Sequence, residues 1–165
     1  QVFRPNSTVA GANVNTAQNI FGVGVTLSAS TVYRFEAVYA ISKTTGSTSH
    51  SIGLGFGGTA TVNNIAYSNT GLFKSTGFSA VTTPDVLSFI QTTANTAVSA
   101  STTAASVQFI TRLSGTVSVN AGGTFIPQYT LSSAPGGAYT TALGSYFQIW
   151  PIGASGSNTS VGTWA

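Results

Sequence analysis

Few side chains in this chain can transfer protons near neutral pH. The 165 residues include one histidine, His50, and two acidic residues, Glu36 and Asp85. Two carboxyl groups at a suitable separation form the catalytic pair of a glycosidase. A histidine and an aspartate beside a serine form the triad of a nucleophilic hydrolase. Glu36, Asp85 and His50 are therefore the residues to weigh for catalysis.

Glu36 and His50 are better explained by structural roles. Glu36 follows Arg34 by two positions, which in a strand places the two opposite charges on one face, where they can pair. His50 alternates with apolar residues at 52, 54 and 56, as on the buried face of a strand. The G-x-S-x-G pattern that presents a nucleophilic serine does not occur. We therefore expect no catalytic residue and no enzymatic activity.

Metal and cofactor sites are not expected either. The chain has no cysteine, and one histidine with two acids falls short of the three or four convergent ligands of a usual metal site. Residues 53–58 match the letters G-x-G-x-x-G, but the dinucleotide fingerprint also needs a helix that starts within it and a later acid. Residues 59–64 are not a helix start. The glycines instead predict a bulge or the close approach of another strand or subunit.

In the segments that contain these residues, apolar and other side chains alternate with a period of two, which indicates strands. Together they predict an all-β chain, an antiparallel β-sandwich or jelly roll of about 8–10 strands. Residues 43–47 are expected to form a hairpin loop, and residues 92–106 a loop with a short strand, or alternatively a short helix around 97–105. The alternating runs are Ile20–Leu27, Val32–Ile41, Ser49–Phe56, Thr59–Tyr67, Val86–Thr92, Val107–Leu113, Thr116–Val119, Phe125–Leu131 and Tyr146–Ile152.

The length of the chain predicts a single jelly-roll domain over residues 1–165. Residues 1–18 are expected to form an extended N-terminal arm and residues 154–165 an irregular tail. The alternation assigns one face of the central strands to the core. The expected core residues are Tyr33, Phe35, Tyr39, Phe147 and Ile149.

The low charge of the chain excludes several classes of protein. Charged residues make up 4% of the sequence, where about 25% is usual. Their place is taken by Ser, Thr, Gly and Asn rather than by apolar residues. No apolar run approaches the ~20 residues of a membrane span, so no membrane insertion is expected. The five cations are scattered, so no nucleic-acid partner is expected.

A surface of hydroxyls and small side chains favours contact between subunits. Charges keep proteins apart in solution, and hydroxyls lose their hydration at less cost than charges do. We therefore expect a permanent oligomer, with Val38, Tyr146 and Trp150 at the subunit interface. As an alternative role, exposed aromatic residues could stack on sugars, with Tyr67, Tyr139, Trp150 and Trp164 as the candidates.

Several segments resemble known proteins. Residues 31–39 (TVYRFEAVY), 50–56 (HSIGLGF), 115–125 (GTVSVNAGGTF) and 144–151 (GSYFQIWP) resemble trimeric jelly rolls of the tumour-necrosis-factor-like and complement-head type. More narrowly, PQYTLSSAPGG, SYFQIWPIG and SVGTWA resemble C-terminal domains of virion proteins of marine tailed bacteriophages such as cyanophages.

The resemblance implies a homotrimer at the virion surface. Such a protein would decorate or cement the capsid, or form the end of a head or tail fibre, with capsid or fibre proteins of the same virion as partners. The alternative is a carbohydrate-binding adhesin, a receptor-binding module at a fibre tip that contacts host surface glycans. Gly123 stands where the general fold usually has an acid, so no calcium site is carried over.

Overall fold

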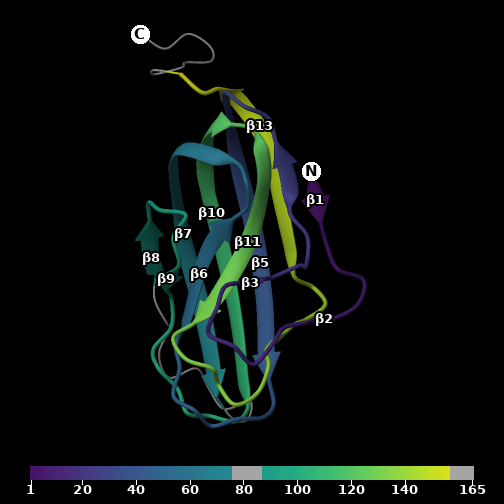
Figure 1. Cartoon of the computed structure of the whole chain (residues 1–165), viewed down its shortest axis with the longest axis vertical. Helices are drawn as coiled ribbons and strands as arrows, with labels where there is room; N and C mark the ends of the chain where they lie inside the picture. Colours follow the sequence, from purple (N-terminus) through teal and green to yellow (C-terminus); the bar gives the residue numbers. More distant parts are fainter. Residues whose placement is uncertain (76–86, 157–165) are drawn as a thin grey trace.

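The computed structural model describes residues 1–75 and 87–156. Within these ranges the chain forms strands, turns and connections, and no helix. Two antiparallel sheets pack face to face, which confirms the predicted all-β antiparallel sandwich (Figure 1). Among the described residues no helix is long and apolar enough to cross a membrane.

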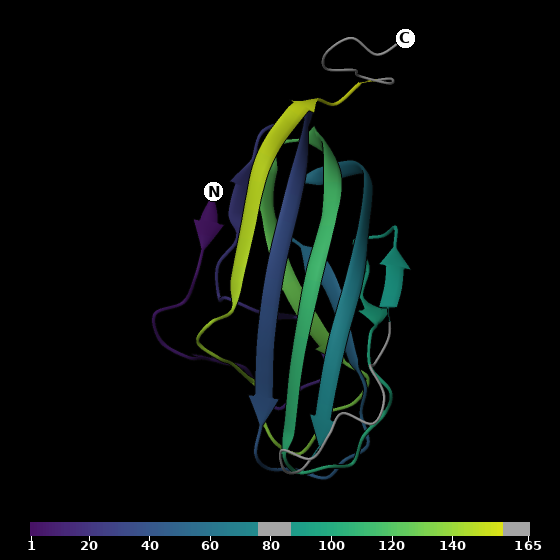
Figure 2. The same ribbon diagram turned by 180° about the vertical axis from the view of Figure 1, so that it is seen from behind.

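Within the described residues, the larger sheet holds eight strands and the smaller sheet five. Seen from behind, the long strands β13, β5, β10 and β7 run side by side (Figure 2). The larger sheet consists of β1 (Val2–Phe3), β13 (Tyr146–Ala154), β5 (Thr31–Lys43), β10 (Val107–Ala121), β7 (Thr61–Ser75) and β8 (Leu87–Ile90), with β2 (Val9–Ala10) and β12 (Thr140–Thr141) alongside β5. The smaller sheet consists of β3 (Gln18–Asn19), β11 (Gly123–Leu131), β6 (Ile52–Gly57) and β9 (Thr96–Ala97), with β4 (Val25–Leu27) also paired to β11.

An aromatic cluster fills the space between the sheets. The rings of Phe56 on β6 and Phe125 on β11 stack with centroids 4.5 Å apart. Phe35 on β5 contacts Phe56 edge to face at 5.4 Å, which joins the two sheets. The residues expected in the core are all buried, with at most 8% of each exposed: Tyr33, Phe35, Tyr39, Phe147 and Ile149.

Residues 20–27 do not form the single strand that their alternation predicts. Ile20 and Phe21 are adjacent, yet both are buried. Gly22 has a φ of +71°, a left-handed conformation that turns the chain between β3 and β4. The prediction is wrong here because the turn interrupts the strand and leaves Val23 exposed, although Phe21 and Leu27 are buried as the alternation predicts.

The predicted hairpin over residues 43–47 is also wrong. β5 and β6 are consecutive, but they lie in different sheets. Both long edges of β5 are already hydrogen-bonded, one to β10 and the other to β13 and β12. The connection therefore crosses from one sheet to the other instead of folding β6 back beside β5.

Two neighbouring segments behave as the sequence predicts. Residues 92–106 form a loop with one short strand, β9, and a bridge between His50 and Thr102, so the alternative of a helix is wrong. This loop passes directly over the glycines of β6. A Cβ at Gly55 would lie 2.9 Å from the carbonyl oxygen of Thr93, which confirms the close approach of another segment. β6 is consequently buried on both faces.

Candidate functional site

The outward side of the larger sheet is a broad surface that no described segment covers (Figure 2). It follows from strand alternation, because residues between the buried aromatic ones must point away from the core. We call this surface the outer face. It includes Arg34, Glu36, Val38 and Ala40 of β5, Ile110, Arg112 and Ser114 of β10, Ser68 and Thr70 of β7, and Tyr146, Gln148 and Trp150 of β13.

The charges of the outer face are few and partly neutralised. Arg34 Nη2 lies 3.2 Å from Glu36 Oε1, which confirms the pairing expected from their spacing. The second carboxylate oxygen of Glu36 accepts a hydrogen bond from Gln148 Nε2 at 3.1 Å. Arg112 is exposed and forms no ion pair with any residue of the described ranges. A single unpaired guanidinium therefore remains on the face.

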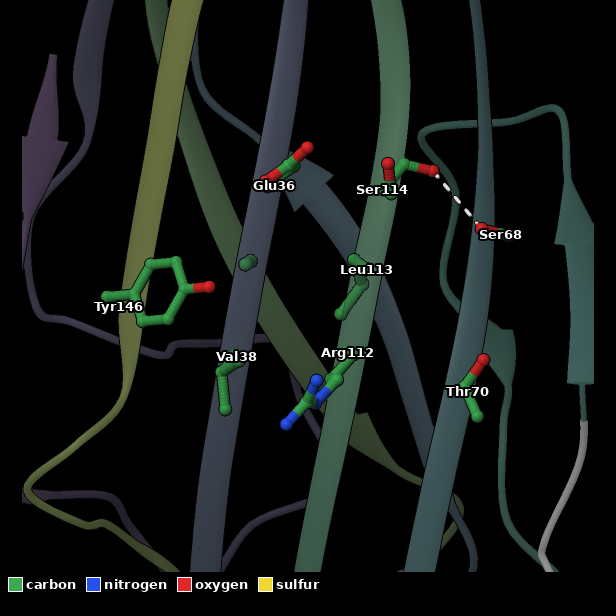
Figure 3. Close-up of a pocket in the computed structure, with 9 residues that line it drawn as sticks. Glu36, Val38, Ser68, Thr70, Arg112, Leu113, Ser114 and Tyr146 are labelled. Carbon is green, nitrogen blue, oxygen red and sulfur yellow. Dashed lines mark hydrogen bonds between the residues drawn. The ribbon is translucent and has the colours of Figure 1, made fainter.

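A shallow hollow of about 240 Å³ lies near the middle of the outer face (Figure 3). Ser68 Oγ donates a hydrogen bond to the backbone oxygen of Ser114 at 3.4 Å across neighbouring strands. The lining combines hydroxyls, one guanidinium, one carboxylate and one aromatic ring. This mixture suits hydrogen bonding to a polar surface or ligand. The residues that line the hollow are Glu36, Ala37, Val38, Ser68, Thr70, Arg112, Leu113, Ser114 and Tyr146.

The structure brings two of the predicted interface residues together. Val38 and Tyr146 are directly opposite each other on β5 and β13, and both line the hollow. Trp150 lies farther along β13, opposite Arg34, on the same face. All three are half-buried. Arg112 was missed by the sequence reasoning, although its alternation with Phe109, Thr111 and Leu113 could have placed it outward.

The catalytic candidates are not assembled into one site. Glu36 lies on the outer face, whereas His50 is buried, with 1% exposed. His50 Nε2 lies 2.7 Å from the Tyr139 hydroxyl oxygen, and burial lowers the pKa of the imidazole. Asp85 lies outside the described residues. Among the residues that are described, no three His, Asp or Glu side chains gather as metal ligands.

The aromatic residues proposed to stack on sugars are mostly not at the surface. Tyr67 exposes 1% and Tyr139 0%, because both point into the sandwich. That expectation is wrong for these two residues. Trp164 lies outside the described residues. Among the candidates that the structure describes, Trp150 alone is half-buried rather than buried, and Tyr146 is the aromatic residue at the hollow.

Comparisons with protein-family models, curated proteins and solved structures find no match to this chain. The resemblance to trimeric jelly rolls and to phage virion proteins therefore stays a prediction. The function has to be inferred from the outer face and from the order of the strands.

Proposed function

We propose that this protein is a non-enzymatic structural subunit of a bacteriophage virion surface, and that it works by binding copies of itself through the outer face. The observation that carries the proposal is the outer face itself. It extends over four long strands, no described segment covers it, and its accessible side chains are mainly hydroxyl, amide and apolar. Its role would be to decorate or cement a capsid, or to end a head or tail fibre.

The composition of the outer face favours a protein partner of similar composition. Hydroxyl and amide groups can exchange water for partner groups at moderate cost, whereas unpaired charges cannot. Glu36 already forms an ion pair with Arg34 and accepts a hydrogen bond from Gln148 within the subunit, so it brings little unpaired charge to a contact. Tyr146 and Trp150 offer large rigid contact areas, as residues at the centres of interfaces commonly do.

The strand order supports the finer expectation of a jelly roll. Among the described strands, the chain changes sheet between β2 and β3, β4 and β5, β5 and β6, β6 and β7, β8 and β9, β9 and β10, β10 and β11, and β11 and β12. The first strand, β1, pairs with the last, β13. When β7 and β8 at one edge are set aside, the strand orders β1-β13-β5-β10 and β3-β11-β6-β9 remain, with β2, β12 and β4 alongside. Four strands along each path is the size of a double Greek-key sandwich.

A closed trimer fits a contact that joins two different patches of each subunit. When the outer face of one subunit contacts a different surface of the next subunit, each subunit is related to its neighbour by a rotation. If three such rotations make a full turn, the subunits form a closed ring. Native mass spectrometry and analytical ultracentrifugation at micromolar concentration test this. We expect a mass three times the 16.7 kDa of the chain. A monomer under these conditions would contradict the proposed function.

The outer face itself is tested by Val38→Arg, which places a charge beside Tyr146 and the hollow. We expect this variant to remain folded and to dissociate to monomers. Thr26→Arg is the matched control, because Thr26 is exposed on β4 of the smaller sheet. A trimer in the Val38→Arg variant would exclude the outer face as the interface. Location is tested separately, by imaging intact virions that carry the protein and reading the local symmetry of its density.

A second candidate function is carbohydrate binding at a fibre tip, and the hollow is the observation that favours it. Tyr146 can stack on a sugar ring, while Arg112 and the hydroxyls of Ser68 and Thr70 can bind its oxygens. A glycan array with the intact protein and with Tyr146→Ala tests this function. Binding that is lost in the variant would support it, and a blank array would remove it.

A further inference from the structure

The side-chain ammonium of Lys43 is enclosed by backbone carbonyl groups. Lys43 is the last residue of β5 and exposes 2% of its surface. Its Nζ donates to the oxygens of Gly46 at 2.7 Å and Ala104 at 2.6 Å, and to those of Thr45 and Ala105 at 3.2 Å each. No carboxylate is among these acceptors. We call the four carbonyl groups the carbonyl cradle.

The cradle joins parts of the chain that are distant in sequence. Thr45 and Gly46 belong to the connection between β5 and β6, and Ala104 and Ala105 precede β10. A third connection supports it from the other side. Gly46 has a φ of +85°, and a Cβ there would lie 2.4 Å from the oxygen of Pro135. A glycine is therefore required at this position, and the packing holds the Gly46 part of the cradle in place.

The chemistry of the cradle suits a monovalent cation. Calcium binds oxygens at about 2.3–2.6 Å and usually through carboxylates, and magnesium binds at about 2.0–2.1 Å. Rings of backbone carbonyls instead replace the hydration shell of potassium ions, and they accept hydrogen bonds from ammonium groups. The donor–acceptor distances around Lys43 Nζ, from 2.6 to 3.2 Å, fit this second class.

We propose that the carbonyl groups of Thr45, Gly46, Ala104 and Ala105 form a monovalent-cation site whose native occupant is the ammonium of Lys43. The chain supplies its own cation, so this end of the sandwich needs no free ion to hold its connections together. When the side chain is truncated, the same carbonyls bind potassium or ammonium from solution. This inference is independent of the proposed function.

The experiment compares Lys43→Ala with Lys43→Met and the unsubstituted protein. Urea unfolding is followed in choline chloride, potassium chloride and ammonium chloride at matched ionic strength. Truncation to alanine opens the cradle, so a potassium or ammonium ion should be able to bind there. When the concentration of the ion is ten times its dissociation constant, the folding equilibrium constant of this variant should rise about tenfold. The methionine variant fills the space without a charge, so it and the unsubstituted protein should show no difference between the salts.

The outcomes are decisive in both directions. Equal stability of Lys43→Ala in all three salts would overturn the proposal. So would failure of this variant to fold in every salt, because an ion from solution should then occupy the cradle. A potassium effect of the same size in Lys43→Met would also count against it, since it would show that the ion acts elsewhere.

The pKa of His50, the single histidine of the chain, provides a second readout. A purely structural role for Lys43 would not make this pKa fall when potassium is added to Lys43→Ala. The positive charge of Lys43 contributes to the lowering of the pKa of His50, after the larger effect of burial. The other polar groups that contact the His50 ring are neutral: the carbonyl oxygen of Thr48 and the hydroxyl of Tyr139. In an NMR titration, the pKa of His50 should rise in Lys43→Met. It should also rise in Lys43→Ala in choline and fall again on addition of potassium. An unchanged pKa across these samples would contradict an exchangeable cation in the cradle.

Discussion

His50 Nε2 lies 2.7 Å from the hydroxyl oxygen of Tyr139, and Nδ1 of the same ring lies 2.7 Å from the carbonyl oxygen of Thr48. A carbonyl oxygen can only accept, so Nδ1 carries the proton of the neutral ring. Tyr139 must then donate its hydroxyl proton to Nε2. The two rings also meet edge to face, with centroids 5.6 Å apart. This pair fixes one tautomer of a buried imidazole and joins residue 50 to the chain before β12.

Tyr139→Phe tests the hydrogen bond of this pair. The change keeps the ring and its packing but leaves Nε2 of His50 buried without a partner. We expect the free energy of unfolding to fall by about 1–2 kcal/mol. Urea unfolding at pH 7.5 measures it. Tyr67→Phe is the control, because its hydroxyl is also buried but finds no hydrogen-bond partner among the described residues, so its removal should cost little. Equal losses in the two variants would contradict a special role for the buried pair.

The pH dependence of stability should report the buried imidazole. Burial lowers the pKa of His50 below its ordinary value of about 6.5, so the folded state prefers the neutral ring. The contribution of the neutral His50 ring to stability is complete above about pH 6.5, the pKa in the unfolded state. It declines as the pH falls below this value and through the lower pKa of the folded state. Urea unfolding between pH 7 and 5 should therefore show falling stability. His50→Gln should be less stable but lack this slope, and a flat profile for the unsubstituted protein would contradict the prediction.

Strand periodicity identified local relationships and missed long-range ones. Arg34 and Glu36 are two residues apart, so their shared face and ion pair followed from alternation alone. Gln148, which binds the same carboxylate, is 112 positions away from Glu36 and could not be assigned to it. The hollow has the same origin, since it needs β7, β10, β5 and β13 in adjacent positions. Pairing between strands depends on which edges remain free, and no local pattern encodes that.

The close contact over β6 can be tested by Gly55→Ala. The new Cβ would lie 2.9 Å from the oxygen of Thr93, whose position is also fixed by a hydrogen bond from the amide of Phe56 at 2.9 Å. Because backbone must shift, we expect a loss of about 1–3 kcal/mol and faster hydrogen exchange at the Phe56 amide. Gly153→Ala is the matched control, since nothing lies within 4 Å of a Cβ there. If the Phe56 amide is protected from hydrogen exchange as well in Gly55→Ala as in the unsubstituted protein, the loop over β6 can move aside without loss of stability, and the prediction is wrong.

The aromatic cluster between the sheets should account for a measurable part of the stability. Phe125 exposes 2% of its surface, and its ring stacks on Phe56 at an interplanar angle of 14°. Phe125→Leu removes this stacking and leaves a small cavity, so the free energy of unfolding should fall by about 1–2 kcal/mol. Phe89→Leu makes the same chemical change on β8 at a side chain that is 69% exposed, and it should have little effect. Urea unfolding separates the two variants, and near-ultraviolet circular dichroism should weaken more in the first. A larger loss at position 89 than at position 125 would mean that the main apolar contacts of this sandwich lie elsewhere than between its sheets.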